Sequence, residues 1–237
     1  MSPSPTKPKG FLLINKPRGS TSFSLVRTLR RRLDVKKVGH AGTLDPFATG
    51  VMILLVGRDY TRLSDKFLTQ DKEYIAKLHL GITTDSFDCD GAITEENDSV
   101  PTKEAVEEAI THFQGTVEQV PPMFSAKKVN GKKLYELARK GVEIERKAVS
   151  VEMKTKLLSY EYPYMEIKVS CSKGTYIRSI ADDLGKKLGC GAHLCELTRT
   201  KAGSYTIEQC LDGSLLEDPN TDVAAHLREV PCASSNH

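Results

Sequence analysis

Residues 39–56 of the chain read GHAGTLDPFATGVMILLV. Three glycines, one proline and two threonines fall within the first twelve positions, so residues 39–50 are expected to form a loop. The six apolar residues that follow have the length and composition of a buried strand. A polar loop fixed to a buried strand can hold a reactive side chain rigidly. His40 and Asp45 are the candidates, although a tight turn with a surface histidine is the ordinary interpretation of this composition.

The overall composition is that of a globular protein. Of 237 residues, 39% are hydrophobic and 27% are charged, which fits one large domain or two small ones. The longest apolar run has six residues, far fewer than a membrane-spanning helix needs. The six cysteines form no CxxC pair, so neither a disulfide framework nor a zinc site is indicated. These features predict a cytoplasmic protein with no metal and no membrane association.

Basic residues are concentrated in two segments. Residues 1–40 carry ten Lys or Arg and one acidic residue, and residues 122–147 carry eight Lys or Arg and three Glu. The net charge of the whole chain is only +3. If the fold brings the two segments together, they form a face for a polyanion. Two unrelated, solvated surface segments are the alternative.

The periodicity of apolar residues predicts strands and helices without regular βαβ alternation, which favours an α+β fold over a doubly wound sheet. One helix is expected to be capped by Ser22 and to turn Phe23, Val26, Leu29 and Leu33 inward. Another is expected to be capped by Thr102. The remaining expected helices are 59–68, 134–140 and 174–188, and the expected strands are 10–15, 51–56, 72–80, 148–160, 164–171, 192–200 and 203–207.

Several common catalytic motifs are absent from the sequence. There is no P-loop, dinucleotide-binding fingerprint, nucleophile elbow or HExxH helix. Residues 83–91 hold three Asp, but the downstream Glu of a calcium loop is missing.

Six further segments accompany the 39–50 loop in a fixed order. They are NKPRG at 15–19, DKEY at 71–74, SAKK at 125–128, GKKLY at 131–135, SKGTYIRS at 172–179 and GCGAHL at 189–194. With the loop, they resemble the bacterial tRNA pseudouridine synthase B (TruB) family across roughly residues 10–210. The resemblance implies an α+β pseudouridine synthase fold, whose mixed, largely antiparallel central sheet is flanked by helices. It also implies a basic, thumb-like RNA-binding insertion at residues 123–147.

The resemblance implies an activity as well. The chain would isomerise the T-loop uridine of tRNA, uridine 55, to pseudouridine, without a cofactor. Asp45 matches the family's catalytic carboxylate, which either adds covalently to the nucleotide or removes a sugar proton; the sequence leaves both open. Arg178 would keep Asp45 ionised, and Tyr74 would stack on the target base.

The same resemblance implies a set of substrate-binding residues. His40 would help to fill the space left when the target base is flipped out of the RNA. Four residues match pocket-lining positions, and core packing of the last two is compatible with that role: Lys16, Pro17, Tyr176 and Leu197. Four lysines of the insertion would contact phosphates: Lys127, Lys128, Lys132 and Lys133.

Three regions are expected along the chain: a disordered arm at 1–9, a catalytic domain at 10–211 and a short tail at 212–237. The tail is shorter than the ~40 residues that fold unaided, so a complete C-terminal PUA domain is not expected. The chain is therefore interpreted as a minimal monomeric synthase that binds the T-arm of tRNA and requires no protein partner. A non-catalytic tRNA-binding or tRNA-folding protein and a guide-RNA-directed synthase are the alternatives. The trio of Asp45, Tyr74 and Arg178 favours the enzyme.

Overall fold

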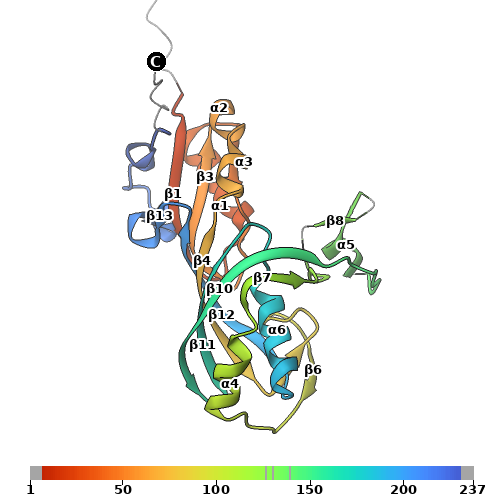
Figure 1. Cartoon of the computed structure of the whole chain (residues 1–237). Helices are drawn as coiled ribbons and strands as arrows, with labels where there is room; N and C mark the ends of the chain where they lie inside the picture. The colour runs from red at the N-terminus through yellow and green to blue at the C-terminus, as the bar shows by residue number, and fades with distance from the viewer. Residues whose placement is uncertain (1–6, 126, 130, 139, 231–237) are drawn as a thin grey trace, which may run out of the picture. The chain divides into compact units, whose positions relative to one another are not determined.

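The computed structural model describes residues 7–125, 127–129, 131–138 and 140–230 (Figure 1). The chain forms two compact units. Unit 1 contains the residues up to Gln70 and those from Thr198 onward, and unit 2 contains residues 71–197. Strand β12 (Ala192–Ala202) carries the chain from unit 2 back into unit 1. Residues 1–6 of the expected arm and residues 231–237 of the expected tail lie outside the described part.

The sheet of unit 1 is built around β3 (Thr49–Val56), which is buried along nearly its whole length. This confirms the buried strand expected at 51–56. Strand β1 (Gly10–Lys16) and strand β2 (Val38–Ala41) pair with β3 in the antiparallel sense, and the end of β12 runs parallel to it. The two short strands of the unit are β13 (Tyr205–Thr206), which pairs with β12, and β14 (Leu211–Asp212), which runs parallel to β1.

The 39–50 segment is only partly a loop. Its first three residues lie in β2, and Thr49 and Gly50 already belong to β3. The expectation of a loop throughout was wrong, because pairing with β3 overrides the local preference of a glycine-rich segment. The true loop is residues 42–48, and it connects two strands that are both paired with their neighbours.

Helix α1 (Ser22–Leu33) packs beside β2. Its N-cap is Thr21, whose hydroxyl accepts the Ser24 N–H at 3.0 Å, so the expected cap at Ser22 is off by one residue. Phe23 was expected to point inward but is 60% exposed. The side chains that α1 buries are instead Ser22, Leu25, Val26, Thr28 and Leu29.

The remaining helices of unit 1 are short. The single helix expected at 59–68 is divided into α2 (Arg58–Thr61) and α3 (Ser64–Leu68). Three 3₁₀ helices follow β13: η1 (Ile207–Gln209), η2 (Gly213–Leu216) and η3 (Val223–His226). Residues 212–230, expected as a tail, pack against α1 and β1. The guanidinium of Arg32 donates to the carbonyls of Asp218 and Thr221, each at 2.6 Å.

Unit 2 contains an antiparallel sheet in the order β4 (Lys72–Leu80), β11 (Tyr164–Cys171), β10 (Val149–Glu161) and β7 (Gln114–Gln119). Buried and half-buried residues alternate along β4, as its sequence predicted. Helices α4 (Lys103–Ile110) and α6 (Ile177–Leu188) lie side by side, against β10 and β4 respectively (Figure 1). Thr102 caps α4, as expected, through its hydroxyl and the Ala105 N–H.

Two hairpins complete unit 2. One consists of β5 (Ile82–Thr84) and β6 (Ile93–Glu96), which were not expected. The other consists of β8 (Lys128–Val129) and β9 (Lys132–Lys133) and is followed by α5 (Leu134–Ala138), so it lies in the basic insertion. The mostly antiparallel pairing and the flanking helices confirm the α+β fold class.

Gly185 provides a test of how tightly unit 2 is packed. A Cβ atom at this α6 position would meet the backbone of Gly191 and Ala192 at the start of β12. Alanine improves helix propensity by ~1 kcal/mol, but overpacking costs typically ~1–3 kcal/mol. We therefore expect Gly185→Ala to lower the free energy of unfolding, measured by urea denaturation. The control is Gly39→Ala, where the nearest atom, Cγ2 of Thr61, lies at 3.6 Å. Greater stability of Gly185→Ala than of wild type would contradict this packing.

Candidate active site

Asp45 lies in the 42–48 loop, between side chains that point into the core. Its neighbours Leu44 and Phe47 are each only 4% exposed, whereas Asp45 itself is half-buried. The hydroxyl of Ser22 donates to the carbonyl of Leu44 at 3.1 Å and accepts the Leu44 N–H at 3.0 Å. On the other side of Asp45, the carbonyl of Pro46 accepts the Gly19 N–H at 2.8 Å. The backbone on both sides of Asp45 is therefore held in place, while the residue itself stays partly accessible.

Lys16 is hydrogen-bonded to the same loop from the interior of unit 1. Its side chain is fully buried, and its ammonium donates to the carbonyls of Pro17 at 3.0 Å, Ser20 at 2.6 Å and Pro46 at 3.1 Å. Burial lowers the pKa of Lys16 from 10.5 to about 8; the negative charge of Asp45 opposes this effect and the positive charge of Arg199 adds to it. Lys16 thus acts chiefly by joining the 17–20 turn to the Asp45 loop.

Arg199 was missed by the sequence interpretation. It is 2% exposed, and its guanidinium donates to the carbonyl of Val51 at 2.7 Å and to that of Gly42 at 3.3 Å. It therefore ties the beginning of the loop to β3. Gly50, whose φ is +104°, lets β12 approach closely, because a Cβ there would collide with the backbone of Arg199. A single arginine in a strand carries no local signal of this role.

His40 lies on β2, directly before the loop. Within the described residues, its Nδ1 is buried and has no hydrogen-bond partner. Burial, and secondarily the charge of Arg199, lower the pKa of His40, so its imidazole is neutral at pH 7. A buried polar atom without a partner is costly, and it is a feature that a bound substrate can satisfy.

Arg178, the second residue of α6, is 6% exposed. Its Nη1 lies 3.2 Å from Oδ2 of Asp88 and donates to the carbonyl of Ser86 at 3.2 Å, while Nη2 donates to the carbonyl of Phe124 at 2.7 Å. Asp88 is 4% exposed, and its Oδ1 accepts hydrogen bonds from the Ser86 hydroxyl at 2.6 Å and the Asp90 N–H at 3.1 Å. Asp88, not singled out from the sequence, therefore positions Arg178.

Three other predicted residues also belong to unit 2. Tyr74 is buried on β4 opposite Val169 of β11. Tyr176 is the N-cap residue of α6, and the side chain of Gln119 binds both its N–H at 2.7 Å and its carbonyl at 3.0 Å. Leu197, on β12, is 6% exposed.

The structure distributes the predicted site residues between the two units. Lys16, Pro17, His40 and Asp45 belong to unit 1, where Lys16 and Asp45 interact electrostatically. Tyr74, Tyr176, Arg178 and Leu197 belong to unit 2. The expected partnership of Asp45 with Arg178 joins residues of different units and stays a prediction.

The lysines of the insertion lie on or next to its hairpin. Lys127 is half-buried and precedes β8, and its carbonyl accepts the Leu134 N–H at 2.9 Å. Lys128 lies on β8, paired with Lys133, while Lys132 is paired with Val129. The expected phosphate contacts of these side chains stay predictions.

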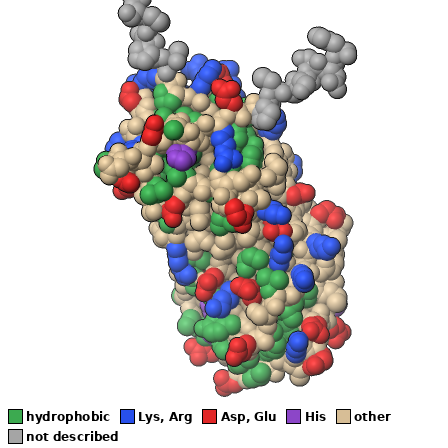
Figure 2. Space-filling model, turned by 90° about the vertical axis from the view of Figure 1, so that its left-hand side faces the viewer, with side chains coloured by type: hydrophobic (Ala, Val, Ile, Leu, Met, Phe, Trp, Pro, Cys, Tyr) green, Lys and Arg blue, Asp and Glu red, His purple; other side chains and the backbone are tan. Residues whose placement is uncertain are grey.

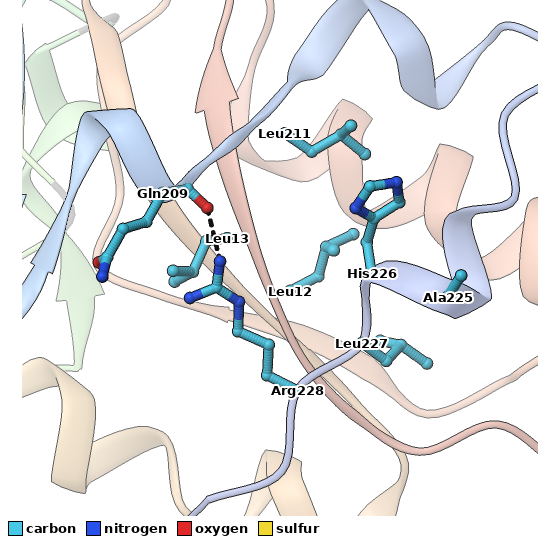
Figure 3. Close-up of a pocket in the computed structure, with 8 residues that line it drawn as sticks. All are labelled: Leu12, Leu13, Gln209, Leu211, Ala225, His226, Leu227 and Arg228. Carbon is cyan, nitrogen blue, oxygen red and sulfur yellow. Dashed lines mark hydrogen bonds between the residues drawn. The ribbon is translucent and has the colours of Figure 1, made fainter.

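Two cavities among the described residues have linings that do not include these residues. One, of about 250 Å³ in unit 1, is lined by residues that include His226 and Arg228, whose Nη2 donates to the Gln209 carbonyl at 2.7 Å (Figure 3). The other, of about 380 Å³ in unit 2, is lined by residues that include Asp182 and Lys186. Neither cavity is lined by a predicted site residue.

On the face drawn in Figure 2, acidic and basic side chains are interspersed, so that face does not present charge of a single sign. The part of the chain that the structure describes holds no group of three or more His, Cys, Asp or Glu suited to a metal ion. None of its helices has the length and apolar character required to cross a bilayer.

Comparison with known proteins identifies the family. The model of the TruB family pseudouridylate synthase N-terminal domain matches residues 30–177, more than half of the chain. The chain belongs to the TruB family. The tRNA pseudouridylate synthase B C-terminal domain matches residues 178–230, a range that includes most of the expected tail. The family resemblance seen in the sequence is therefore confirmed, and the enzyme class is that of an isomerase acting on tRNA.

Individual relatives agree with this assignment. The chain is 63% identical over 214 residues to tRNA pseudouridine synthase B of Protochlamydia amoebophila (strain UWE25). The aligned residues cover 90% of this chain and 82% of that protein. It is 59% identical over 221 residues to the protein of the same name from Chlamydia abortus (strain DSM 27085 / S26/3), and the aligned residues cover 93% of this chain and 94% of that protein.

A solved structure supports the fold. The chain matches one in the crystal structure of a Cbf5-Nop10-Gar1 complex with a TM-score of 0.70 and 26% identity, over 93% of this chain and 60% of that one. A TruB-family chain therefore has the pseudouridine synthase fold that its sequence predicted.

The lowered pKa of Lys16 predicts a pH effect on turnover. Above pH 8 the ammonium loses a proton, so it can no longer donate to all three carbonyls, and Asp45 loses a neighbouring positive charge. We expect kcat/KM for pseudouridine formation to fall as the pH rises through about 8. This fall should not reflect unfolding. Because the folded-state pKa lies below the unfolded-state value, the linkage term of Lys16 increases stability between about pH 8 and 10.5.

The measurement is a pH–rate profile recorded beside urea denaturation at each pH. Lys16→Met should turn over more slowly and lack the fall near pH 8. A wild-type profile that stays flat from pH 7 to 9 would contradict the assignment to Lys16.

Asp88 predicts an effect on both stability and turnover. Asp88→Asn leaves the buried guanidinium of Arg178 without its carboxylate partner, and breaking a buried ion pair typically costs ~3–5 kcal/mol. We expect a lower urea midpoint. Because the family resemblance predicts that Arg178 acts in catalysis, we also expect at least a ~10-fold loss of turnover when it is misplaced. The matched control is Asp90→Asn, two residues away and exposed, which should behave like wild type. Equal turnover by the two variants would show that Asp88 does not position Arg178 for catalysis.

Proposed function

We propose that the chain converts uridine 55 in the T-loop of tRNA to pseudouridine and that Asp45 is its catalytic carboxylate. The observation that carries this proposal is a half-buried Asp45 in a loop whose neighbouring residues are buried or hydrogen-bonded. Catalysis requires the reacting group to be held in place rather than merely present. Membership of the TruB family and the names of the relatives support the choice of substrate.

The reaction is an isomerisation in which all atoms are retained. The bond between N1 of uracil and C1′ of ribose breaks, the base turns, and C5 forms a bond to C1′. The proton that C5 loses is balanced by the proton that N1 gains. Asp45 acts on the sugar or the base, either by adding covalently or by removing a sugar proton, and both routes require its ionised form.

The other predicted residues receive roles around Asp45. Tyr74 stacks on the flipped uracil, and Arg178 supplies a positive charge for the carboxylate. His40, whose buried Nδ1 lacks a partner within the described residues, faces the RNA from which the base has been withdrawn. Lys16 and Pro17 shape the pocket through the 17–20 turn, and Tyr176 and Leu197 complete its lining. The insertion lysines contact phosphates of the T-arm.

The proposal extends to the oligomeric state, location and partners of the chain. The chain acts as a monomer on the T-arm of tRNA, in the cytoplasm, and needs neither a protein partner nor a cofactor. A tRNA-folding activity on the same scaffold is a second candidate, since the two basic segments could bind RNA without any chemistry. The two candidates differ in their need for Asp45.

Asp45→Asn separates them. The substitution keeps the shape of the side chain and removes its charge, so we expect pseudouridine formation in a T-arm stem-loop to fall by at least ~10²-fold, as for a missing acid or base. Binding of the RNA should remain within a few-fold of wild type. Asp59→Asn, an exposed change on α2, is the control. Turnover by Asp45→Asn close to that of wild type would exclude Asp45 as the catalytic group, and a wild-type protein that forms no pseudouridine would favour the folding activity.

A further inference from the structure

Phe23 is a large aromatic side chain that the core of unit 1 does not use. It lies in the first turn of α1 and is 60% exposed, the largest exposed fraction of any described phenylalanine. A single exposed apolar residue is common on protein surfaces and has no meaning by itself. The neighbours of Phe23 are what distinguish it.

Arg30 holds the ring on one side. Its guanidinium carbon lies 5.9 Å from the centroid of the Phe23 ring, within the range of a cation–π contact. Its Nη2 also donates to the carbonyl of Val38 at 2.8 Å, so the guanidinium is anchored to β2. Arg27, one helical turn from Phe23, is exposed. Within the described residues, no acidic side chain forms an ion pair with Arg27 or Arg30. The result is an aromatic ring beside two arginines that no acid neutralises.

This group lies next to the segments that carry Asp45 and His40. Ser22, which precedes Phe23, is hydrogen-bonded through its hydroxyl to both the N–H and the carbonyl of Leu44, the residue before Asp45. Val38, which anchors Arg30, lies two residues before His40 on the same strand. All of these residues belong to unit 1. An RNA loop bound at Asp45 would therefore pass close to Phe23.

We infer that Phe23, with Arg27 and Arg30, forms a stacking subsite for an unpaired nucleobase in the RNA loop that contains the target uridine. The inference rests on the proposed function, because it assigns a second contact to the same substrate. Single-stranded loops expose unstacked bases, which proteins stack on aromatic rings and on guanidinium planes. The ring binds the base, Arg30 keeps the ring in place, and Arg27 contacts a phosphate. The cationic surroundings fit RNA better than an apolar protein partner.

The first experiment compares variants of Phe23 by the anisotropy of a fluorescent T-arm stem-loop at fixed salt. Phe23→Ala should raise Kd about tenfold, equivalent to about 1.4 kcal/mol, because a stacked base is lost. Phe23→Tyr, which keeps the aromatic face, should bind within about threefold of wild type, and Phe23→Leu, which is apolar without such a face, should bind as weakly as Phe23→Ala. Since the ring is exposed, all three should unfold at the wild-type urea midpoint.

The matched control is Tyr164→Ala. Tyr164 is also an exposed aromatic, 43% accessible, with the ammonium of Lys77 4.7 Å from its ring centroid. It is paired with His79 on β4, five positions from Tyr74, or roughly 17 Å along the strand. Its removal should leave Kd unchanged.

A second experiment locates the base. Stem-loops with one abasic loop position each are bound to wild type and to Phe23→Ala. One position should weaken binding to wild type about tenfold and have no further effect on Phe23→Ala, because the two changes remove the same contact. A Kd of Phe23→Ala within twofold of wild type, or Phe23→Leu binding as tightly as wild type, would overturn the subsite. Failure of the proposed function is distinct, since it would appear as an absence of pseudouridine formation by wild type.

Discussion

The buried ammonium of Lys16 is the interaction on which the geometry around Asp45 depends. A charge removed from water is costly unless it is paired and fully hydrogen-bonded. Lys16 meets this condition with three carbonyl oxygens, of which one follows Asp45 in the chain and two lie in the 17–20 turn. Those carbonyls can converge on one point only if the turn and the loop are held together. Moving the Asp45 loop away from the turn would leave the buried ammonium without all of its hydrogen bonds, so the position of Asp45 is restricted.

Arg199 applies the same principle at the other side of the loop. Its guanidinium binds the carbonyls of Gly42 and Val51. These two bonds connect the first residue of the irregular 42–48 segment to β3, the strand that follows that segment. The positive charge of Arg199 also acts on two neighbouring groups, because it lowers the pKa of both Lys16 and His40. In unit 2, the buried guanidinium of Arg178 likewise binds two carbonyls as well as the Asp88 carboxylate. Both units therefore use buried cations to order loops that have little regular structure.

The elements that sequence analysis placed correctly are those with a strong local pattern. The alternation along β4, the apolar run of β3 and the Thr102 cap of α4 were all recognisable without a structure. The failures have a common cause in tertiary contacts. The Ser22 hydroxyl is buried against Leu44, so α1 turns Phe23 outward although its spacing suited an inward face. Residues 38–41 form a strand because β3 lies beside them, which the glycine-rich sequence of residues 39–50 does not indicate.

The sequence by itself determined the α+β class, the family and the loop that carries Asp45, because ordered motifs and apolar periodicity are properties of the chain alone. Only the tertiary structure decided which buried cations hold that loop, which carboxylate positions Arg178 and which face α1 exposes. Lys16 and Pro46 are thirty residues apart, and Arg199 and Gly42 are 157 apart. Contacts over such separations depend on which strands pair in the folded sheet, and no local pattern of residue types encodes that choice.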